Sequence, residues 1–251
     1  MVTSVLLTSW LAAAAMAPPP VQAGVSATFD MPVAITLNEP VRVTMRIRNL
    51  LNEPVKFDLG WNRTQGLALV VRGPDGGVHT PTITPSGVGR IGRIELAPQG
   101  EYIQPLVLND WMPFDRPGPY QIEIRFTTRF VSASGPVIGR PSETLTLEIR
   151  PRNVAILEHA YWELVDAYLN TVGEQRWYAA QVLRHLTDPV AVPMLRRILD
   201  STELNDSIVL DTLRKIGTPD AVGVLQEMAA SESADRAAMA KSVLERLRLG
   251  R

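Results

Sequence analysis

The sequence contains no cysteine, and this absence excludes several kinds of site at once. Without thiols the chain cannot form disulfides, a zinc site with thiolate ligands or a cysteine nucleophile. Histidine is also scarce, because only three occur among 251 residues, and His79, His159 and His185 fall in three different predicted elements. Since histidine is the commonest metal ligand and general base, little material is available for either role. The residues therefore predict no catalytic group, no cofactor and no metal ligand, and hence a protein that is not an enzyme.

An excess of charge of either sign is missing too. The chain has 25 Lys and Arg residues and 26 Asp and Glu residues, which gives a formal net charge of −1. A chain with this balance has no global field that would recruit a polyanion. We therefore expect neither a nucleic acid nor an anionic membrane surface as a partner.

The N-terminal segment has the pattern of a secretory signal peptide. It reads MVTSVLLTSWLAAAAMAPPPVQA, in which an apolar stretch is followed by three prolines and a small-residue end at Ala23. The stretch is shorter than the roughly 20 residues that a membrane-spanning helix needs. No Lys or Arg precedes Arg42, so a basic start is missing unless the true start lies upstream or the free amine suffices. We expect residues 1–23 to be removed, leaving an exported protein, periplasmic or extracellular, that begins at Gly24 and is not inserted in a membrane.

Residues 24–150 show the alternation of apolar and polar side chains that is typical of half-buried strands. The alternation is clearest in VRVTMRIRNL, YQIEIRF and ETLTLEIR, which begin at Val41, Tyr120 and Glu143. Turn residues separate such runs, and Asp75 followed by Gly76 is a strong hairpin signal because glycine accepts the positive φ of a tight reversal. Strands at this spacing, without a helical period, predict a β-sandwich.

Three segments, LNEPVRVTMRIRN, LAPQGEYIQPLVLNDW and PGPYQIEIRF, follow one another within roughly residues 33–127. In this order they resemble the Ig-like accessory domains of bacterial exported proteins. They also resemble the intracellular proteinase inhibitor fold, in which a strand ending in Trp leads to a G-x-Y turn and a closing strand. Trp111 and the turn from Gly118 to Tyr120 carry that second resemblance, which implies a fold and not inhibitory activity. Core packing is the ordinary role of such aromatic residues in a sandwich.

After Pro151 the apolar period changes from two residues to about 3.6. The segment VAILEHAYWELVDAYLN, residues 154–170, is therefore predicted to be an amphipathic helix. Its apolar face comprises Leu157, Tyr161, Leu164, Val165 and Tyr168, and its polar face comprises His159, Glu163, Asp166 and Asn170.

The C-terminal part repeats itself. The segment LRHLTDPVAVPML, which begins at Leu183, returns as LRKIGTPDAVGVL, which begins at Leu213. In each copy a polar residue, Asp188 or Thr187 and then Thr218, precedes a proline. A polar N-cap followed by proline starts a helix, so each copy is predicted to form helix, tight turn, helix. A third half-copy places Leu244 and Leu247 at an offset of 31 from Leu213 and Ile216.

The pattern AAQVLRHLTDPVAVPMLRRIL, with its A-x-x-L-x-x-L, D-P turn and A-V-x-x-L, resembles HEAT-like repeats of the short bacterial type over roughly residues 174–249. Some relatives carry a phycobilin-lyase label in their name, but the repeat is a scaffold and implies no lyase chemistry. The fold class is thus a multidomain all-β plus all-α protein, with an Ig-like β-sandwich at 24–150 followed by HEAT-like α-helical repeats at 151–251. Because a terminal repeat needs a cap, we expect the sandwich to cover one end of the stack through the helix that begins near Asn153.

Two sets of polar residues have a spacing that could suit a metal. His159, Glu163 and Asp166 share a predicted helix face, but a solvated face explains the same spacing and no HExxH motif supports a site. Asp110 and Asp115 flank Trp111 and would suit calcium, although such residues also hold turns together. We therefore predict no metal site.

Aromatic and basic residues are the candidates for partner binding. Trp61 lies in WNRTQG and Trp111 in NDWMPF; if exposed they would be anchors, and if buried they belong to the core. On the helical part, Trp177, Tyr178, Arg196 and Arg197 are predicted to form an exposed patch.

The sequence therefore predicts a non-catalytic binding or scaffold protein of the bacterial cell envelope, with an unidentified protein partner. Two other classes stay open. A proteinase-inhibitor-like sandwich would insert an ordered loop, around Trp61 or Trp111, into a protease. A hydrolase would use the scattered carboxylates in a convergent pocket.

Overall fold

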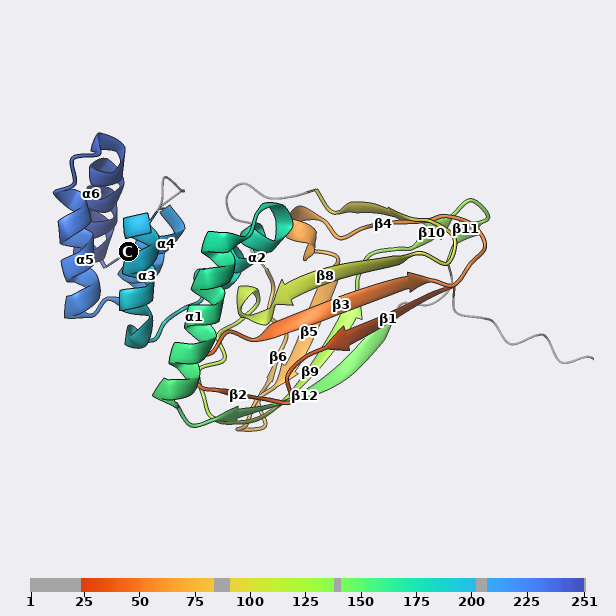
Figure 1. Ribbon diagram of the computed structural model, residues 1–251. Helices are drawn as coiled ribbons and strands as arrows, with labels where there is room; N and C mark the ends of the chain where they lie inside the picture. The colour runs from red at the N-terminus through yellow and green to blue at the C-terminus, as the bar shows by residue number, and fades with distance from the viewer. Residues whose placement is uncertain (1–23, 84–90, 138–140, 202–206, 251) are drawn as a thin grey trace, which may run out of the picture.

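The computed structural model describes residues 24–83, 91–137, 141–201 and 207–250, so the expected signal peptide at 1–23 lies outside the described residues. Strands occur between Val25 and Arg150, and α-helices occur between Val154 and Arg248 (Figure 1). The predicted fold class, a β-sandwich followed by helical repeats, is confirmed. No helix within the described ranges is long and apolar enough to cross a bilayer.

The β-domain consists of two facing layers (Figure 1). One layer is a sheet in the order β2-β12-β9-β5-β6, and the other contains the sheets β1-β3-β8 and β11-β10-β4-β7. The strands are β1 Val25–Asp30, β2 Ala34–Thr36, β3 Arg42–Asn49, β4 Val55–Asp58, β5 Leu67–Arg72, β6 Val78–His79, β7 Arg93–Leu96, β8 Glu101–Val107, β9 Gly118–Phe126, β10 Val131–Ser132, β11 Gly135–Pro136 and β12 Ser142–Arg150.

Side-chain alternation decides which face of each strand is buried. In β3, Val43, Met45 and Ile47 are buried, whereas Arg46 and Arg48 are exposed. The facing strand β9 buries its alternate residues in the same way, and both sets belong to one hydrophobic core. Because successive side chains of a strand point to opposite faces, the alternation of the sequence is sufficient to orient each sheet.

Turns and corners of the sandwich follow the predicted chemistry. The β5–β6 hairpin reverses at Gly76, whose φ of 78° lies in the region that glycine favours. Tyr120 is buried, and its hydroxyl donates to the carbonyl of Arg116 at 3.1 Å. This bond closes the corner before β9, so the packing role expected of Tyr120 is confirmed.

The first helix has the two faces that its sequence predicts. All five residues of the apolar set, from Leu157 to Tyr168, are buried, and the polar set is exposed. The Asn153 side chain accepts from the N–H of Ile156 at 3.2 Å and caps the helix. The helices are α1 Val154–Asn170, α2 Gly173–Leu183, α3 Val192–Ser201, α4 Ser207–Ile216, α5 Pro219–Ala229 and α6 Ala234–Arg248.

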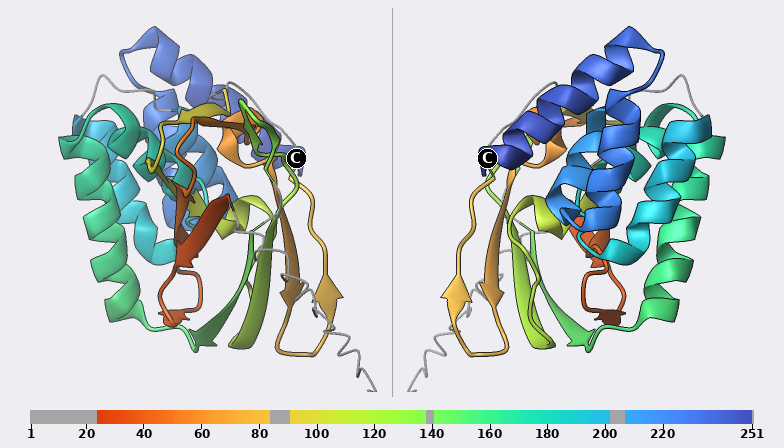
Figure 2. Two further views of the ribbon diagram at one scale, coloured as in Figure 1. Left: turned by 90° about the vertical axis from the view of Figure 1, so that its right-hand side faces the viewer. Right: turned by 90° about the vertical axis from the view of Figure 1, so that its left-hand side faces the viewer.

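The repeated segments form a stack of two helical layers (Figures 1 and 2). Helices α2, α4 and α6 contact one another in sequence, as do α1, α3 and α5. The carboxylate of Asp188 accepts from the N–H of Val190 at 3.0 Å, and the hydroxyl of Thr218 accepts from the N–H of Ala221 at 3.4 Å. The predicted turn is confirmed, and Asp188 rather than Thr187 is the cap of the first copy.

Candidate binding surface at the domain junction

The two domains share apolar packing at the end of β8. Leu106 belongs to the core of the sandwich, whereas its neighbour Val107 belongs to the core of the helical stack. Consecutive residues can serve two cores because their side chains point to opposite sides of the strand. The sandwich therefore covers the end of the stack that α1 and α2 form, as Figure 1 shows, and the expected capping is confirmed.

The segment between the domains is held by a buried hydroxyl. Thr36 of β2 donates to the carbonyl of Pro151 at 2.9 Å and accepts from the N–H of Asn153 at 2.8 Å. Strand β2 also pairs in parallel with the last residues of β12. The chain is consequently fixed to the sandwich up to the residue that caps α1.

A buried carboxylate joins the repeat turn to the sandwich. The Asp188 side chain is fully buried and accepts from Arg152 twice, Nε at 2.6 Å and Nη2 at 2.9 Å. It also accepts from the side-chain amide of Asn38 at 2.9 Å, besides capping the turn that begins at Pro189. The carboxylate thus receives donors from the interdomain segment, the sandwich and the repeat turn. A buried charge is tolerated when hydrogen bonds and an opposite charge satisfy it in this way.

Acid is expected to weaken this contact. The hydrogen bonds from Arg152, with those from Val190 and Asn38, lower the pKa of Asp188 to about 2, although burial opposes the shift. In an unfolded chain the pKa of Asp is about 3.9, so the stabilisation is complete above about pH 4 and is lost as the pH falls towards about 2. Urea unfolding at about pH 5 and about pH 3 should show a shrinking difference in stability between wild type and Asp188→Asn. A difference that is independent of pH would contradict this assignment.

Tyr161 makes a second buried bond to the same loop. Its hydroxyl donates to the carbonyl of Asn38 at 2.6 Å, and its side chain is only 1% exposed. Burial, followed by the charges of Asp188 and Glu39, raises the pKa of Tyr161, so the hydroxyl stays protonated and available as a donor.

Tyr161→Phe is expected to lower the free energy of unfolding by about 1–2 kcal/mol, because it removes the donor and leaves the carbonyl of Asn38 without that partner. Tyr178→Phe is the matched control, since the hydroxyl of Tyr178 donates to the carbonyl of Leu106 across the same junction at the longer distance of 3.4 Å. Chemical denaturation measures the free energy of unfolding of both variants, and Tyr161→Phe should lose more than Tyr178→Phe. Equal losses would contradict a stronger bond at Tyr161.

Charged side chains complete the junction on either side of these buried bonds. His185 Nε2 lies 2.7 Å from an Asp110 carboxylate oxygen, and Arg63 Nη1 lies 3.2 Å from Glu174 Oε1. Asp110 ends the 3-10 helix η2, Leu108–Asp110, and Arg63 ends η1, Trp61–Arg63. Loops from one end of the sandwich therefore contact the first turn of α2 and the turn that follows its end.

A cleft of about 260 Å³ lies between the two domains next to His185. The stack contributes two cations to it, Arg184 and Lys215, and the sandwich contributes two carboxylates, Glu39 and Asp115. Asn38, Asn109, Pro113, Phe114 and Thr187 complete the lining. The cleft combines both domains in one surface, and it adjoins a row of charged residues on α4 and α6.

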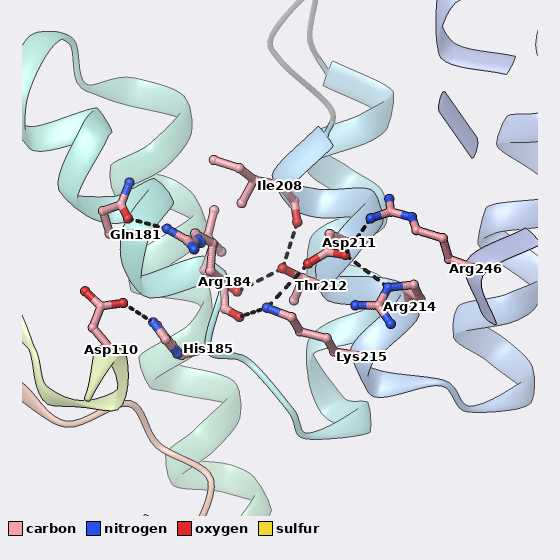
Figure 3. A network of polar contacts seen from close by, with 11 residues as sticks. Asp110, Gln181, Arg184, His185, Ile208, Asp211, Thr212, Arg214, Lys215 and Arg246 are labelled. Carbon is pink, nitrogen blue, oxygen red and sulfur yellow. Dashed lines mark hydrogen bonds and ion pairs between the residues drawn. The ribbon is translucent and has the colours of Figure 1, made fainter. Parts of the chain in front are cut away.

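Figure 3 shows this row, whose centre is Asp211 of α4. Its carboxylate contacts Arg214 Nε at 3.0 Å and Lys215 Nζ at 3.4 Å on the same helix, and Arg246 Nη1 of α6 at 3.8 Å. Lys215 also donates to the carbonyl of Arg184 at 3.1 Å, which connects α4 to α2. Beneath it, the buried hydroxyl of Thr212 lies 2.8 Å from the carbonyl of Ile208 and 3.2 Å from the carbonyl of Leu183, and it can donate to either.

Trp111 is not an exposed anchor, and Trp61 is partly exposed. Trp111 is only 7% exposed and packs in the sandwich core, so its proposed role in partner binding is wrong and the core alternative is correct. Trp61 is half-buried in η1, and its Nε1 is buried without a hydrogen-bond acceptor among the described residues. Exposure could not be inferred from the sequence, because turn-rich surroundings occur beside buried and exposed aromatic residues alike.

The other four candidates do not share one environment. Tyr178 is half-buried and contacts β8, and burial raises its pKa to about 12, so the predicted exposure of Tyr178 is wrong. Trp177 on the same helix is also half-buried. Arg196 and Arg197 are exposed on α3, where Arg196 pairs with Glu227 of α5 at 2.7 Å and Arg197 lies over the ring of Trp162.

The polar sets considered for metals have other contacts. His159 lies 3.2 Å from Glu163, and Asp166 accepts from the side-chain amide of Asn170. Asp110 contacts His185, as described above. Among the described residues no group of three or more His, Cys, Asp or Glu residues has an arrangement that could hold a metal ion.

A second cavity, of about 560 Å³, lies at the same end of the sandwich beside the β5–β6 hairpin. It contains Asp75, His79 and Arg116, polar residues of the kind that a hydrolase could use. However, Asp75 accepts from the N–H of Gly77 at 2.9 Å and from Arg116 at 3.0 Å, and these bonds lower its pKa. The carboxylate holds the turn of the hairpin together.

Known proteins resemble this chain only over parts of its length. Residues 175–201, which span most of α2 and all of α3, match the family model of the PBS lyase HEAT-like repeat. The CARDB domain of the PF1109 protein from Pyrococcus furiosus, solved with di-metal ions, is 11% identical over 51% of this chain and 94% of that chain, with a TM-score of 0.30. The ASH / PapD-like domain of human CEP192 is 14% identical over 61% and 99%, with a TM-score of 0.31.

A β-glucosidase from Listeria innocua, solved with isofagomine, is 10% identical over 50% of this chain and has a TM-score of 0.30. This chain spans only 16% of the length of that enzyme. A search of curated proteins found no significant match.

Proposed function

We propose that the protein is a non-catalytic scaffold that binds another protein in a bacterial cell envelope. The observation that carries the proposal is the junction, where Val107, Tyr161 and Asp188 make buried contacts between the domains. Loops of the sandwich and helices of the stack thereby contribute to one continuous surface. Helical repeats expose extended binding surfaces, and loops at the ends of sandwiches commonly carry function.

Capture of a partner tests the scaffold role. The mature chain, from Gly24 onward, is immobilised and exposed to envelope extract, and any retained protein is purified and its affinity measured by calorimetry. The isolated helical segment is a poor bait, because Val107 supplies part of its core. A partner that binds the wild type but not a folded Asp188→Ala variant would show that recognition needs the intact junction. No specific, measurable partner would contradict the proposal.

Export rests on the pattern of residues 1–23 and has its own test. When the complete chain is expressed in a bacterium, we expect the protein in the periplasm or medium to begin at Gly24, as mass spectrometry of its N-terminus would show. Accumulation in the cytoplasm with the leader retained would contradict export and leave the binding role to be judged separately.

A further inference from the structure

The repeat alignment places a basic residue of each repeat at an equivalent position. The offsets that align Leu183, Leu213 and Leu244 also align His185, Lys215 and Arg246. Lys215 and Arg246 lie on α4 and α6, and His185 lies two residues after the end of α2. These three helices neighbour one another in one layer of the stack. Figure 3 shows the resulting row, which we call the basic ladder and which comprises Arg184, His185, Arg214, Lys215 and Arg246.

One carboxylate, that of Asp211, lies among three cations of the ladder and contacts Arg214, Lys215 and Arg246. Burial opposes ionisation of Asp211, but the hydrogen bond from Arg214 and the charges of Lys215 and Arg214 lower its pKa and keep it ionised. Two of the cations are accessible from solvent, since the side chains of Lys215 and Arg246 are 37% and 49% exposed.

Carboxylates of the sandwich limit the ladder at the junction. Asp110 contacts His185, and Glu39 and Asp115 line the cleft beside Arg184 and Lys215. An acidic ligand is therefore repelled at the sandwich and attracted along α4 and α6. A bound acidic segment would therefore end near the sandwich and run from there across α4 and α6.

We propose that the basic ladder binds an extended acidic segment of the partner protein, an inference that rests on the proposed scaffold function. Packed helices lie about 8–10 Å apart, and an extended chain in the polyproline II conformation advances about 3.1 Å per residue with three residues per turn, so every third side chain points the same way. Neighbouring members of the ladder therefore match carboxylates at every third residue. Exposed ion pairs are individually weak and are screened by salt, so binding needs several of them together and falls as ionic strength rises.

The probe is a fluorescein-labelled peptide of repeated Gly-Glu-Gly units, and its binding to the mature chain is followed by fluorescence anisotropy at low salt. A peptide with Gln in place of Glu should not bind. A peptide of the same composition with its Glu residues consecutive should bind several-fold more weakly. Equal binding of the Glu and Gln peptides would overturn the proposal, and so would equal binding of a single-stranded oligonucleotide, which would indicate a general polyanion site.

Variants of the full mature chain locate the contact. Lys215→Glu should weaken peptide binding about tenfold, because attraction is replaced by repulsion. Lys241→Glu is the matched control with the same change of charge; Lys241 is exposed on α6, five residues before Arg246 and on another side of the helix. It should change affinity less than about twofold. Equal effects of the two variants would overturn the proposal.

Asp211→Asn provides a readout that misfolding cannot imitate. Removing the carboxylate should tighten peptide binding about threefold, because the cations lose their internal partner, even though the melting temperature falls. Weaker binding by Asp211→Asn would contradict the proposal. If a captured partner still binds Lys215→Glu with wild-type affinity, the scaffold function stands and the basic ladder is not its binding site.

Discussion

Asp188→Ala is expected to lower the free energy of unfolding by about 3 kcal/mol, of which about 1 kcal/mol is loss of the helix cap and the rest is loss of buried partners. The side chain is 0% exposed and accepts from Arg152, Asn38 and Val190. Arg152 is 43% exposed and can turn to water, which limits the cost of leaving it without its partner. The amide of Asn38 and the N–H of Val190 have less freedom to do so.

Asp200→Ala is the control for this substitution. Its carboxylate is 59% exposed and lies 3.8 Å from Arg196, an arrangement that should contribute less than about 0.5 kcal/mol. Urea unfolding followed by both tryptophan fluorescence and circular dichroism measures the two losses and reveals whether the domains unfold together. Equal losses for the two variants would show that the buried network does not stabilise the junction.

Asp188→Ala should also open the interdomain segment to proteolysis. Trypsin cuts poorly before proline, so Arg150 is protected by Pro151 and Arg152 is the available site between the domains. In the wild type Arg152 is bound to Asp188, and Asn153 is bound to Thr36. We therefore expect early cleavage after Arg152 in Asp188→Ala and slow cleavage in the wild type, with the first fragments identified by mass spectrometry.

Leu213→Ala is expected to cost about 2–5 kcal/mol, the range for removing a fully buried leucine side chain. Leu213 is 0% exposed and packs in the helical core with Leu183, its equivalent in the preceding repeat. The lost apolar burial and the remaining cavity both contribute to the cost. Thermal and urea unfolding measure it.

Leu244→Ala makes the informative comparison. Leu244 occupies the equivalent position in the third half-copy, but it is only partly buried, because no described helix follows α6 in the stack. The substitution should cost about half as much as Leu213→Ala or less, since a terminal repeat packs against one neighbour only. If both substitutions cost the same free energy of unfolding, the contribution of a leucine would depend on its position within the repeat and not on whether the repeat is internal or terminal.

The predicted strands at 41–50, 120–126 and 143–150 and the predicted helix at 154–170 all occur where expected. Their periods of two and about 3.6 reflect contacts between near neighbours and a single buried face, which a sequence records directly. The caps at Asp188 and Thr218 are equally local, because a side chain there bonds an N–H two or three residues later. The opposed faces of α1 follow for the same reason.

The candidate binding surface was largely missed. His185 contacts Asp110, 75 residues away in the sequence, and no local pattern indicates that contact. Asp188 was predicted as a cap only, although it also binds Asn38 at a separation of 150 residues. The basic ladder did leave a signal, since the offsets that aligned the leucines also align His185, Lys215 and Arg246.

The sequence by itself determined the order of the domains, the turn chemistry of the repeats and the faces that β3, β9, β12 and α1 bury, because these depend on residues close together in the chain. Tertiary structure alone decided that Trp111 and Tyr178 face inward, that Val107 joins the helical core and that Asp188 serves both domains. Those outcomes depend on how one end of the sandwich fits against α1 and α2. No local period or cap records that fit, because its partners come from segments far apart in the chain.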